Sequence, residues 1–162
     1  MISALMSLLA EYRDARREEY IARLRRALAL WAMVATGMSQ RQIAEEVGVS
    51  QPAVSQQLKF APELDGVHPE VLLNAAAPIL KALAADHGYT RLAVFGSVAR
   101  REATPDSNID LIVEAPKGTS TFGFIRFKQL IERVLGRKID LIDYGGLKPK
   151  FDDDIRREAV LL

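Results

Sequence analysis

The chain has 162 residues, of which 49% are hydrophobic and 27% are charged, and its formal net charge is +1. A chain of this length can bury a real core, and its composition agrees with two small domains. The balanced charge is not that of a generally basic protein, so any binding to DNA must depend on where charges are placed locally.

The sequence contains no cysteine, which excludes disulfides, thiol chemistry and a cysteine-based zinc site. No apolar run approaches the roughly twenty residues that a membrane-spanning helix needs. Residues 1–9 are too short for a signal peptide and lack its charged flank and cleavage site. We therefore expect a cytoplasmic protein with no membrane partner.

Residues 2–35 contain neither proline nor glycine, and apolar residues recur in them at helical intervals, which predicts one long helix. Charges of both signs are interspersed along it. They favour a solvated face with ion pairs four residues apart. A flank that contacts DNA phosphates is the alternative. We expect residues 1–9 to pack or to dimerise, which fits a homodimer.

Residues 38–59 carry a two-helix pattern. Ser39 is predicted to cap the first helix and Gly48 to supply a tight turn. Ser50 is predicted to cap the second helix, whose first turn contains Pro52. The apolar positions expected to face inward are Ile43, Ala44, Val47, Val49, Val54 and Leu58. The pattern resembles the helix-turn-helix of bacterial repressors, whose second helix enters the major groove.

This resemblance implies binding to operator DNA. Amide and hydroxyl side chains on the second helix can read base edges, Lys59 can hold a phosphate, and Arg41 on the first helix can contact the backbone. The predicted DNA-binding residues are Arg41, Ser50, Gln51, Ala53, Ser55, Gln56 and Lys59. An ordinary helical hairpin with a polar face is the alternative.

Two prolines and a glycine mark residues 60–69 as a linker. We expect a first domain at residues 1–60, a linker at residues 61–69 and a second domain at residues 70–162. The second domain begins with a predicted amphipathic helix that ends at His87, in which Pro78 could introduce a kink.

Residues 91–95 form a short apolar run that ends at Gly96-Ser97, which predicts a buried strand followed by a tight turn. Ser97 is predicted to cap a helix whose early part includes Glu102. Such a junction directs free backbone N–H groups at one point, which favours phosphate binding. Arg100 either supports the phosphates or pairs with an acid.

The next predicted strand, residues 108–113, begins with Asn108-Ile109-Asp110. Since side chains alternate along a strand, residues 108 and 110 are expected on one face. Two oxygen-bearing side chains opposite a phosphate-binding turn form a candidate Mg²⁺ site.

A third predicted strand, residues 138–143, carries Asp140 and Asp143 on opposite faces. Residues 124–135 before it are predicted to be a helix that packs on the core. The segment after it, residues 145–159, is predicted to end in a helix with acidic residues in its first turn.

Gly96-Ser97, ten intervening residues, Asn108-x-Asp110 and the later Asp140 together resemble the active site of the DNA polymerase beta-like nucleotidyltransferases. The resemblance is closest to their small bacterial members, the minimal nucleotidyltransferases of toxin–antitoxin modules. It covers roughly residues 70–162. It implies a small mixed sheet with flanking helices for these residues. Together with the N-terminal all-α helix-turn-helix domain, the expected fold class is α+β.

The family resemblance implies a role for each matching residue. Gly96, Ser97 and Arg100 would bind the triphosphate of the nucleotide. Asp110, Asp140 and the residue at position 108 would bind Mg²⁺ and form the catalytic set. Asp140 would either lower the pKa of the attacking hydroxyl or accept its proton.

The chain departs from the family pattern at Asn108, where the family has aspartate. Asparagine offers an oxygen but no charge, so the binding of two metal ions should weaken. Three explanations stay open: a natural degenerate enzyme, an engineered substitution that silences the enzyme, or an enzyme that works slowly or with one metal ion.

Two functions follow from this resemblance. In the first, the chain transfers a nucleoside monophosphate, AMP from ATP, to a partner protein such as a cognate toxin, or to RNA such as tRNA. In the second, it is a catalytically inactive DNA-binding antitoxin and autorepressor that neutralises its toxin by binding.

Overall fold

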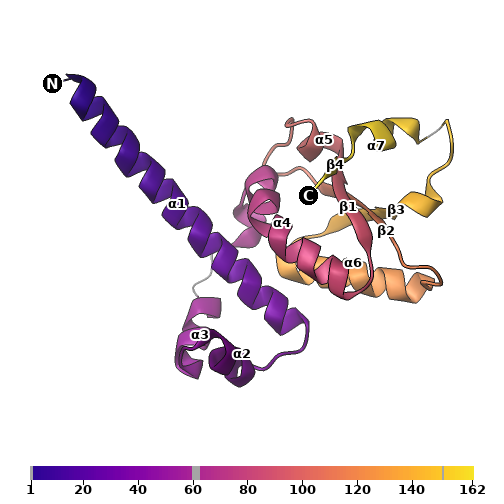
Figure 1. Cartoon of the computed structure of the whole chain (residues 1–162), viewed down its shortest axis with the longest axis horizontal. Helices are drawn as coiled ribbons and strands as arrows, with labels where there is room; N and C mark the ends of the chain where they lie inside the picture. Colours follow the sequence, from indigo (N-terminus) through magenta and orange to yellow (C-terminus); the bar gives the residue numbers. More distant parts are fainter. Residues whose placement is uncertain (1, 60–62, 151) are drawn as a thin grey trace.

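A computed structural model of the chain describes residues 2–59, 63–150 and 152–162. The predicted long helix is observed as α1 (Ile2–Ala35), whose first half stands clear of the rest of the molecule (Figure 1). The buried residues of α1 all lie in its second half: Leu24, Ala27, Leu28, Leu30 and Ala32. Among the described residues, no helix combines the length and apolar character needed to cross a membrane.

Two short helices pack beside the C-terminal end of α1. A reciprocal capping box starts α2 (Gln40–Val47): Oγ of Ser39 accepts from the Gln42 N–H at 3.1 Å, and the Gln42 side chain accepts from the Ser39 N–H at 2.8 Å. Gly48 ends α2 with φ +79°, and α3 (Gln51–Lys59) follows. These helices lie where the sequence predicts them, and DNA binding by the pair stays a prediction.

Two of the six apolar positions expected to face inward in this pair do not. Val47 is 49% exposed and Val49 is 39% exposed. The small core between α1, α2 and α3 is already filled by other side chains: Leu30, Ile43, Ala44 and Val54. Val47 and Val49, at the end of α2 and in the turn, therefore remain on the surface.

Four strands form one mixed sheet in the order β3-β2-β1-β4. The central strand β1 (Thr90–Phe95) pairs antiparallel with β2 (Ile109–Glu114) and with β4 (Val160–Leu161). Strand β2 runs parallel to β3 (Ile139–Asp143). The predicted α+β class, a small mixed sheet with flanking helices, is confirmed. The sequence did not predict β4, because two residues are too few to show alternation.

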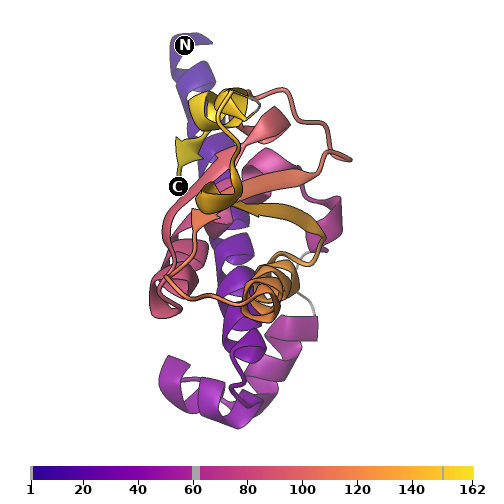
Figure 2. The ribbon, with the colours of Figure 1, turned by 90° about the vertical axis from the view of Figure 1, so that its right-hand side faces the viewer.

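The main core lies on one side of this sheet. Helices α4 (Pro69–Asp86) and α6 (Thr121–Leu135) cover that side, and the second half of α1 packs against both helices (Figures 1 and 2). Pro78 lies inside α4 without ending it. Shorter elements complete the fold: the 3₁₀ turns η1 (Leu64–Gly66) and η2 (Tyr144–Gly146), and the helices α5 (Gly96–Ala99) and α7 (Asp153–Glu158).

Helix α1 contributes to both hydrophobic cores. Leu24 and Leu28 are fully buried in the main core with the sheet, whereas Leu30 belongs to the small core with α2 and α3. The predicted domain boundaries therefore stay a prediction, and residues 60–62, where we expect the first domain to end, lie outside the described residues.

Candidate active site

Asp110 and Asp140 lie side by side on neighbouring parallel strands. They are direct partners in the register of β2 and β3, so their side chains project from the same face of the sheet. The residues on either side of them face the other way and are buried in the main core: Ile109, Leu111, Ile139 and Leu141. The alternation of the two strands thus brings two carboxyl groups together opposite the core.

The surroundings of Asp110 change the pKa of its carboxyl. Partial burial of Asp110, together with the carboxyl of Asp140 within hydrogen-bonding reach, raises the pKa of Asp110 to about 6. The charge of Glu158 acts in the same direction, and that of Arg100 opposes it. Two carboxylates held this close repel each other when both are ionised, so a bound cation between them would be stabilised.

The backbone of Gly96 lies directly beside the Asp110 carboxyl. It follows the last residue of β1, Phe95, which is the register partner of Asp110. The backbone of Gly96 has φ +73°, and a Cβ built there would clash with Oδ2 of Asp110 and lie 3.1 Å from its Cγ. Only glycine lets the chain turn at this point while the carboxyl stays in place.

The helix after Gly96 differs from the one expected. Helix α5 is a single turn, Gly96–Ala99, in which Ser97 is an internal residue and the N-cap position is taken by Phe95 without a side-chain bond. The turn ends because Arg101 adopts φ +58°, in the left-handed region. Ser97 is therefore not the N-cap, and Glu102 lies outside the helix. The partial charge of one turn is also smaller than that of a full helix.

Asn108 is exposed and lies directly before β2. It is two residues from Asp110 along the chain. In the described residues no three His, Cys, Asp or Glu side chains come together in a way that could hold a metal ion. The candidate ligand set is thus two carboxylates and one amide oxygen.

Asp143 faces away from this set. Its Oδ1 accepts from the Gly145 N–H at 3.1 Å and so caps the turn after β3.

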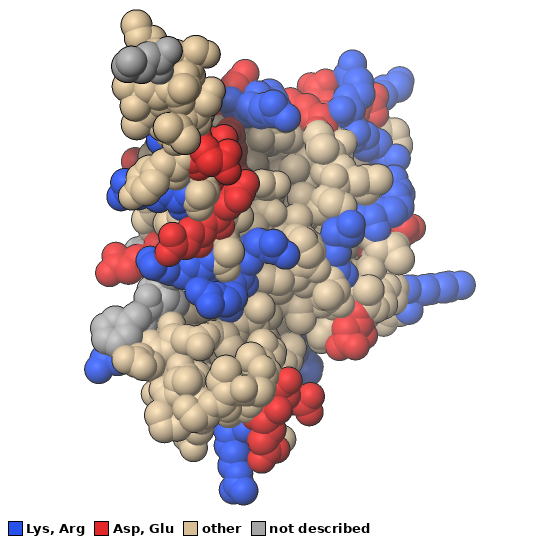
Figure 3. Space-filling model, turned by 60° about the vertical axis from the view of Figure 1, so that its left-hand side comes forward, with Lys and Arg blue, Asp and Glu red and all other residues tan. Residues whose placement is uncertain are grey.

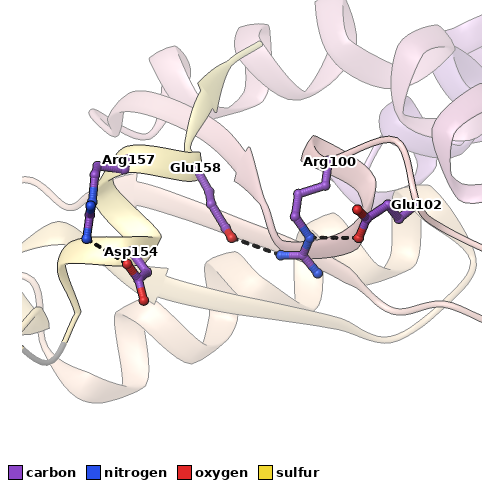
Figure 4. Close-up of polar contacts among 5 residues, drawn as sticks. All are labelled: Arg100, Glu102, Asp154, Arg157 and Glu158. Carbon is purple, nitrogen blue, oxygen red and sulfur yellow. Dashed lines mark hydrogen bonds and ion pairs between the residues drawn. The ribbon is translucent and has the colours of Figure 1, made fainter.

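Arg100 makes ion pairs with two acids. Its Nε donates to Glu102 at 3.0 Å, and its Nη1 donates to both carboxylate oxygens of Glu158, at 3.0 and 3.1 Å (Figure 4). Of the two roles expected for Arg100, pairing with an acid is the one observed. Sequence reasoning missed Glu158, because it lies 58 residues away in α7 and nothing local marks it as a neighbour of the site.

The predicted DNA-binding residues lie elsewhere, on α2, α3 and the turn between them. All are exposed except Ala53, which is half-buried. Oγ of Ser50 accepts from the Ala53 N–H at 3.2 Å, which caps α3. Arg41 lies 3.7 Å from Glu45 across one turn of α2.

Residues 77–162 match the family model of the nucleotidyltransferase domain, and the chain belongs to this family. "Putative protein adenylyltransferase MJ0435" of Methanocaldococcus jannaschii is 40% identical over 74 residues, 46% of this chain and 80% of that protein. "Protein adenylyltransferase MntA" of Thermococcus cleftensis is 34% identical over 80 residues, 49% of this chain and 81% of that protein.

A solved structure gives the same assignment. The "Structure of putative minimal nucleotidyltransferase" is 38% identical to this chain, with a TM-score of 0.53. The match covers 57% of this chain and 95% of that one. The predicted minimal nucleotidyltransferase domain is confirmed, and its fusion to a DNA-binding unit stays a prediction.

The position of Gly96 can be tested with a matched pair of variants. Gly118 has φ +86° and no atom within 4 Å of its built Cβ. Gly96→Ala and Gly118→Ala should both lose roughly 1 kcal/mol of stability in urea, because alanine is disfavoured at positive φ. Only Gly96→Ala should also change the titration of the Asp110 carboxyl in NMR spectra. Equal behaviour of the two variants would contradict the close contact.

The raised pKa of Asp110 predicts that stability depends on pH. Between pH 3.8 and about 6 the folded protein keeps a proton on Asp110 that the unfolded chain has released. Because the folded state binds this proton more tightly, protonation of Asp110 stabilises the fold. The stabilisation is complete below pH 3.8 and is lost as pH rises through about 6. Asp110→Asn, which cannot ionise, should therefore gain stability over the native chain as pH rises from 4 to 7.

The expected gain is on the order of 1 kcal/mol, because solvent screens a half-buried carboxyl. It is measured by urea unfolding at several pH values. Asp106→Asn, in the exposed turn before β2, serves as the control. A stability difference for Asp110→Asn that does not vary with pH would contradict the raised pKa of Asp110.

Proposed function

We propose that this chain is a Mg²⁺-dependent nucleotidyltransferase that transfers AMP from ATP to a hydroxyl of a partner protein. The observation that carries the proposal is the in-register pair Asp110 and Asp140, beside a glycine turn that permits close approach. Two relatives named as protein adenylyltransferases support AMP as the transferred group and protein as the acceptor. An acceptor hydroxyl on tRNA is the alternative.

The reaction assigns a task to each carboxyl. The acceptor oxygen forms a bond to the α-phosphorus of ATP, the bond to the bridging oxygen of the β-phosphate breaks, and pyrophosphate leaves. Asp140, which is exposed, takes the proton of the acceptor hydroxyl. Gly96 and Ser97 hold the triphosphate through the turn after β1.

The residues present fit a divalent cation. Asp110 and Asp140 offer hard oxygen ligands whose mutual repulsion a cation would relieve, and Asn108 offers a carbonyl oxygen. A bound Mg²⁺ would neutralise charge on the phosphates and on the leaving pyrophosphate. Because Asn108 brings no negative charge, we propose that metal binding and transfer are weakened in this chain.

Arg100 would join this site by exchanging partners. Its guanidinium is bound to Glu102 and Glu158 in the structure (Figure 4). We propose that the triphosphate competes with these carboxylates for Arg100, since phosphate is a strong bidentate acceptor for arginine.

Calorimetric titration of ATP with Mg²⁺ into the chain and into Asn108→Asp tests the function. We expect Mg²⁺-dependent binding in both, about tenfold or more tighter in Asn108→Asp, where a third carboxylate is restored. Labelled-nucleotide transfer to co-purified protein should increase in the same variant. Asn108→Asp combined with Asp140→Asn should abolish transfer. If neither chain binds Mg·ATP, the enzymatic proposal fails.

A second candidate function rests on the helical pair. Exposed amide and hydroxyl groups on α3, with Arg41 on α2, support binding to operator DNA. In this proposal the chain is an inactive antitoxin and autorepressor of a toxin–antitoxin locus. Its nucleotidyltransferase domain then serves as a surface that binds the toxin, and the loss of a carboxylate at position 108 favours this function.

DNA binding is tested by selecting duplexes from a random-sequence pool and measuring affinity by fluorescence anisotropy. Gln51→Ala and Gln56→Ala should relax sequence preference, and Lys59→Ala should weaken binding to all duplexes and reduce its salt dependence. Lys81→Ala, an exposed basic residue on α4, is the control. Selection of no sequence, or equal loss in Lys81→Ala, would contradict the proposal.

A further inference from the structure

A groove lies beside α1 at the point where this helix leaves the main core. Arg17 and Ile21 each precede a fully buried leucine of that core, Leu24 and Leu28, by about two helical turns. They therefore continue the face of α1 that packs on the core. Both line a groove with a volume of about 650 Å³, whose other walls are α4, α5 and the edge strand β4. Figure 3 shows largely uncharged surface between α1 and the rest of the molecule, with charged side chains on both sides.

Apolar side chains form much of the wall of this groove. All four elements contribute to them: Ile21, Val71, Ala77, Val98, Val160 and Leu161. Val160 is 53% exposed and Leu161 is 67% exposed, so part of the apolar wall stays uncovered at the edge of the sheet. The volume lies within the roughly 300–1,000 Å³ of pockets that bind small molecules, which combine an apolar lining with a few polar groups.

Glu70, in the first turn of α4, also lines the groove. Its Oε1 is shielded from solvent, and no described residue donates a hydrogen bond to this atom. The ion pairs among the described residues do not include Glu70 either. A buried acceptor without a donor is unfavourable and is rare in folded proteins. After a small rotation of this half-buried side chain, a ligand N–H group in the groove would supply the missing donor.

Two arginines line the same groove. Arg17 belongs to α1, and Arg101 lies two residues after the end of α5. In the part of the chain that the structure describes, neither arginine takes part in an ion pair. Asn74, one turn after Glu70 on α4, adds an amide to the lining. The groove therefore presents two cations and one anion among apolar walls, and a complementary ligand carries an anion and a cation on an apolar body.

We propose that this groove binds a zwitterionic ligand with an apolar body and the size of a short peptide, such as a tripeptide of apolar residues. Its ammonium group would bind Glu70, and its carboxylate would bind Arg101, since arginine and carboxylate form strong charge-assisted hydrogen bonds. Its side chains would cover the exposed wall at Val160 and Leu161. A single apolar amino acid carries the same charges but would leave most of the groove empty.

This groove is separate from the candidate active site. Val94 and its register partner Val160 both line the groove, on the face of the sheet that carries the main core. Asp110 pairs with Phe95, the residue after Val94, so it projects from the opposite face. The proposed ligand uses neither the acidic pair nor the exposed face of α3. Its binding therefore does not depend on either proposed function.

Calorimetric titration of the full chain with tripeptides of leucine, valine or phenylalanine tests the proposal. At least one tripeptide should bind saturably, with one site per chain. Its N-acetylated form lacks the ammonium group and its C-terminal amide lacks the carboxylate, and each should bind about tenfold or more weakly. Binding of none of the tripeptides would overturn the proposal. Free leucine that binds more tightly than every tripeptide would overturn the assignment of a peptide.

Matched variants assign each ligand charge to its residue. Glu70→Gln should weaken binding of the free tripeptide about tenfold or more and leave binding of its N-acetylated form unchanged. Arg101→Gln should weaken binding of the free tripeptide and leave binding of its amide unchanged.

Glu46→Gln on α2 and Arg126→Gln on α6 change exposed residues away from the groove and are the controls. Thermal unfolding should show that all four variants fold like the native chain. Equal loss of binding for every form of the peptide in Glu70→Gln, or the same loss in the controls, would overturn the proposal.

Discussion

The parallel register of β2 and β3 holds two carboxyl groups together against their mutual repulsion. Strand alternation makes this possible. Asp110 and Asp140 point to one face of the sheet, and the aliphatic residues before and after each of them are buried on the other face. Burial of the aliphatic set beneath α4 and α6 supplies the favourable free energy. The register fixes the backbone positions of both acids, and a shift of one residue would expose the whole core face.

The fold also brings a residue from a distant part of the sequence to the candidate site. Helix α7 and strand β4 return the C-terminal segment to the sheet, which brings Glu158 to Arg100. This contact places a third acid and a guanidinium around Asp110, and both affect the pKa of its carboxyl. In the proposed enzyme, a nucleotide that displaces Glu158 from Nη1 of Arg100 would couple nucleotide binding to the position of α7.

Helix α1 ties the two parts of the molecule together. The same helix buries Leu28 against the sheet domain and Leu30 against α2 and α3. The helical pair is therefore packed on a helix that also packs against the nucleotidyltransferase domain. The first half of that helix contributes no buried residue to either core.

The sequence by itself predicted most of the elements and the family of this protein. The absence of proline and glycine from residues 2–35 predicted α1, and the capping serine and the glycine predicted the ends of α2. The spacing from Gly96-Ser97 to Asp110 and Asp140 indicated the nucleotidyltransferase family. These signals are local, or are fixed spacings along the chain. The tertiary structure alone decided that α5 is a single turn, that Val47 and Val49 stay exposed, and that Glu158 binds Arg100. Those outcomes depend on which surfaces meet after folding. A contact between residues dozens of positions apart produces no periodic pattern in the sequence from which it could be predicted.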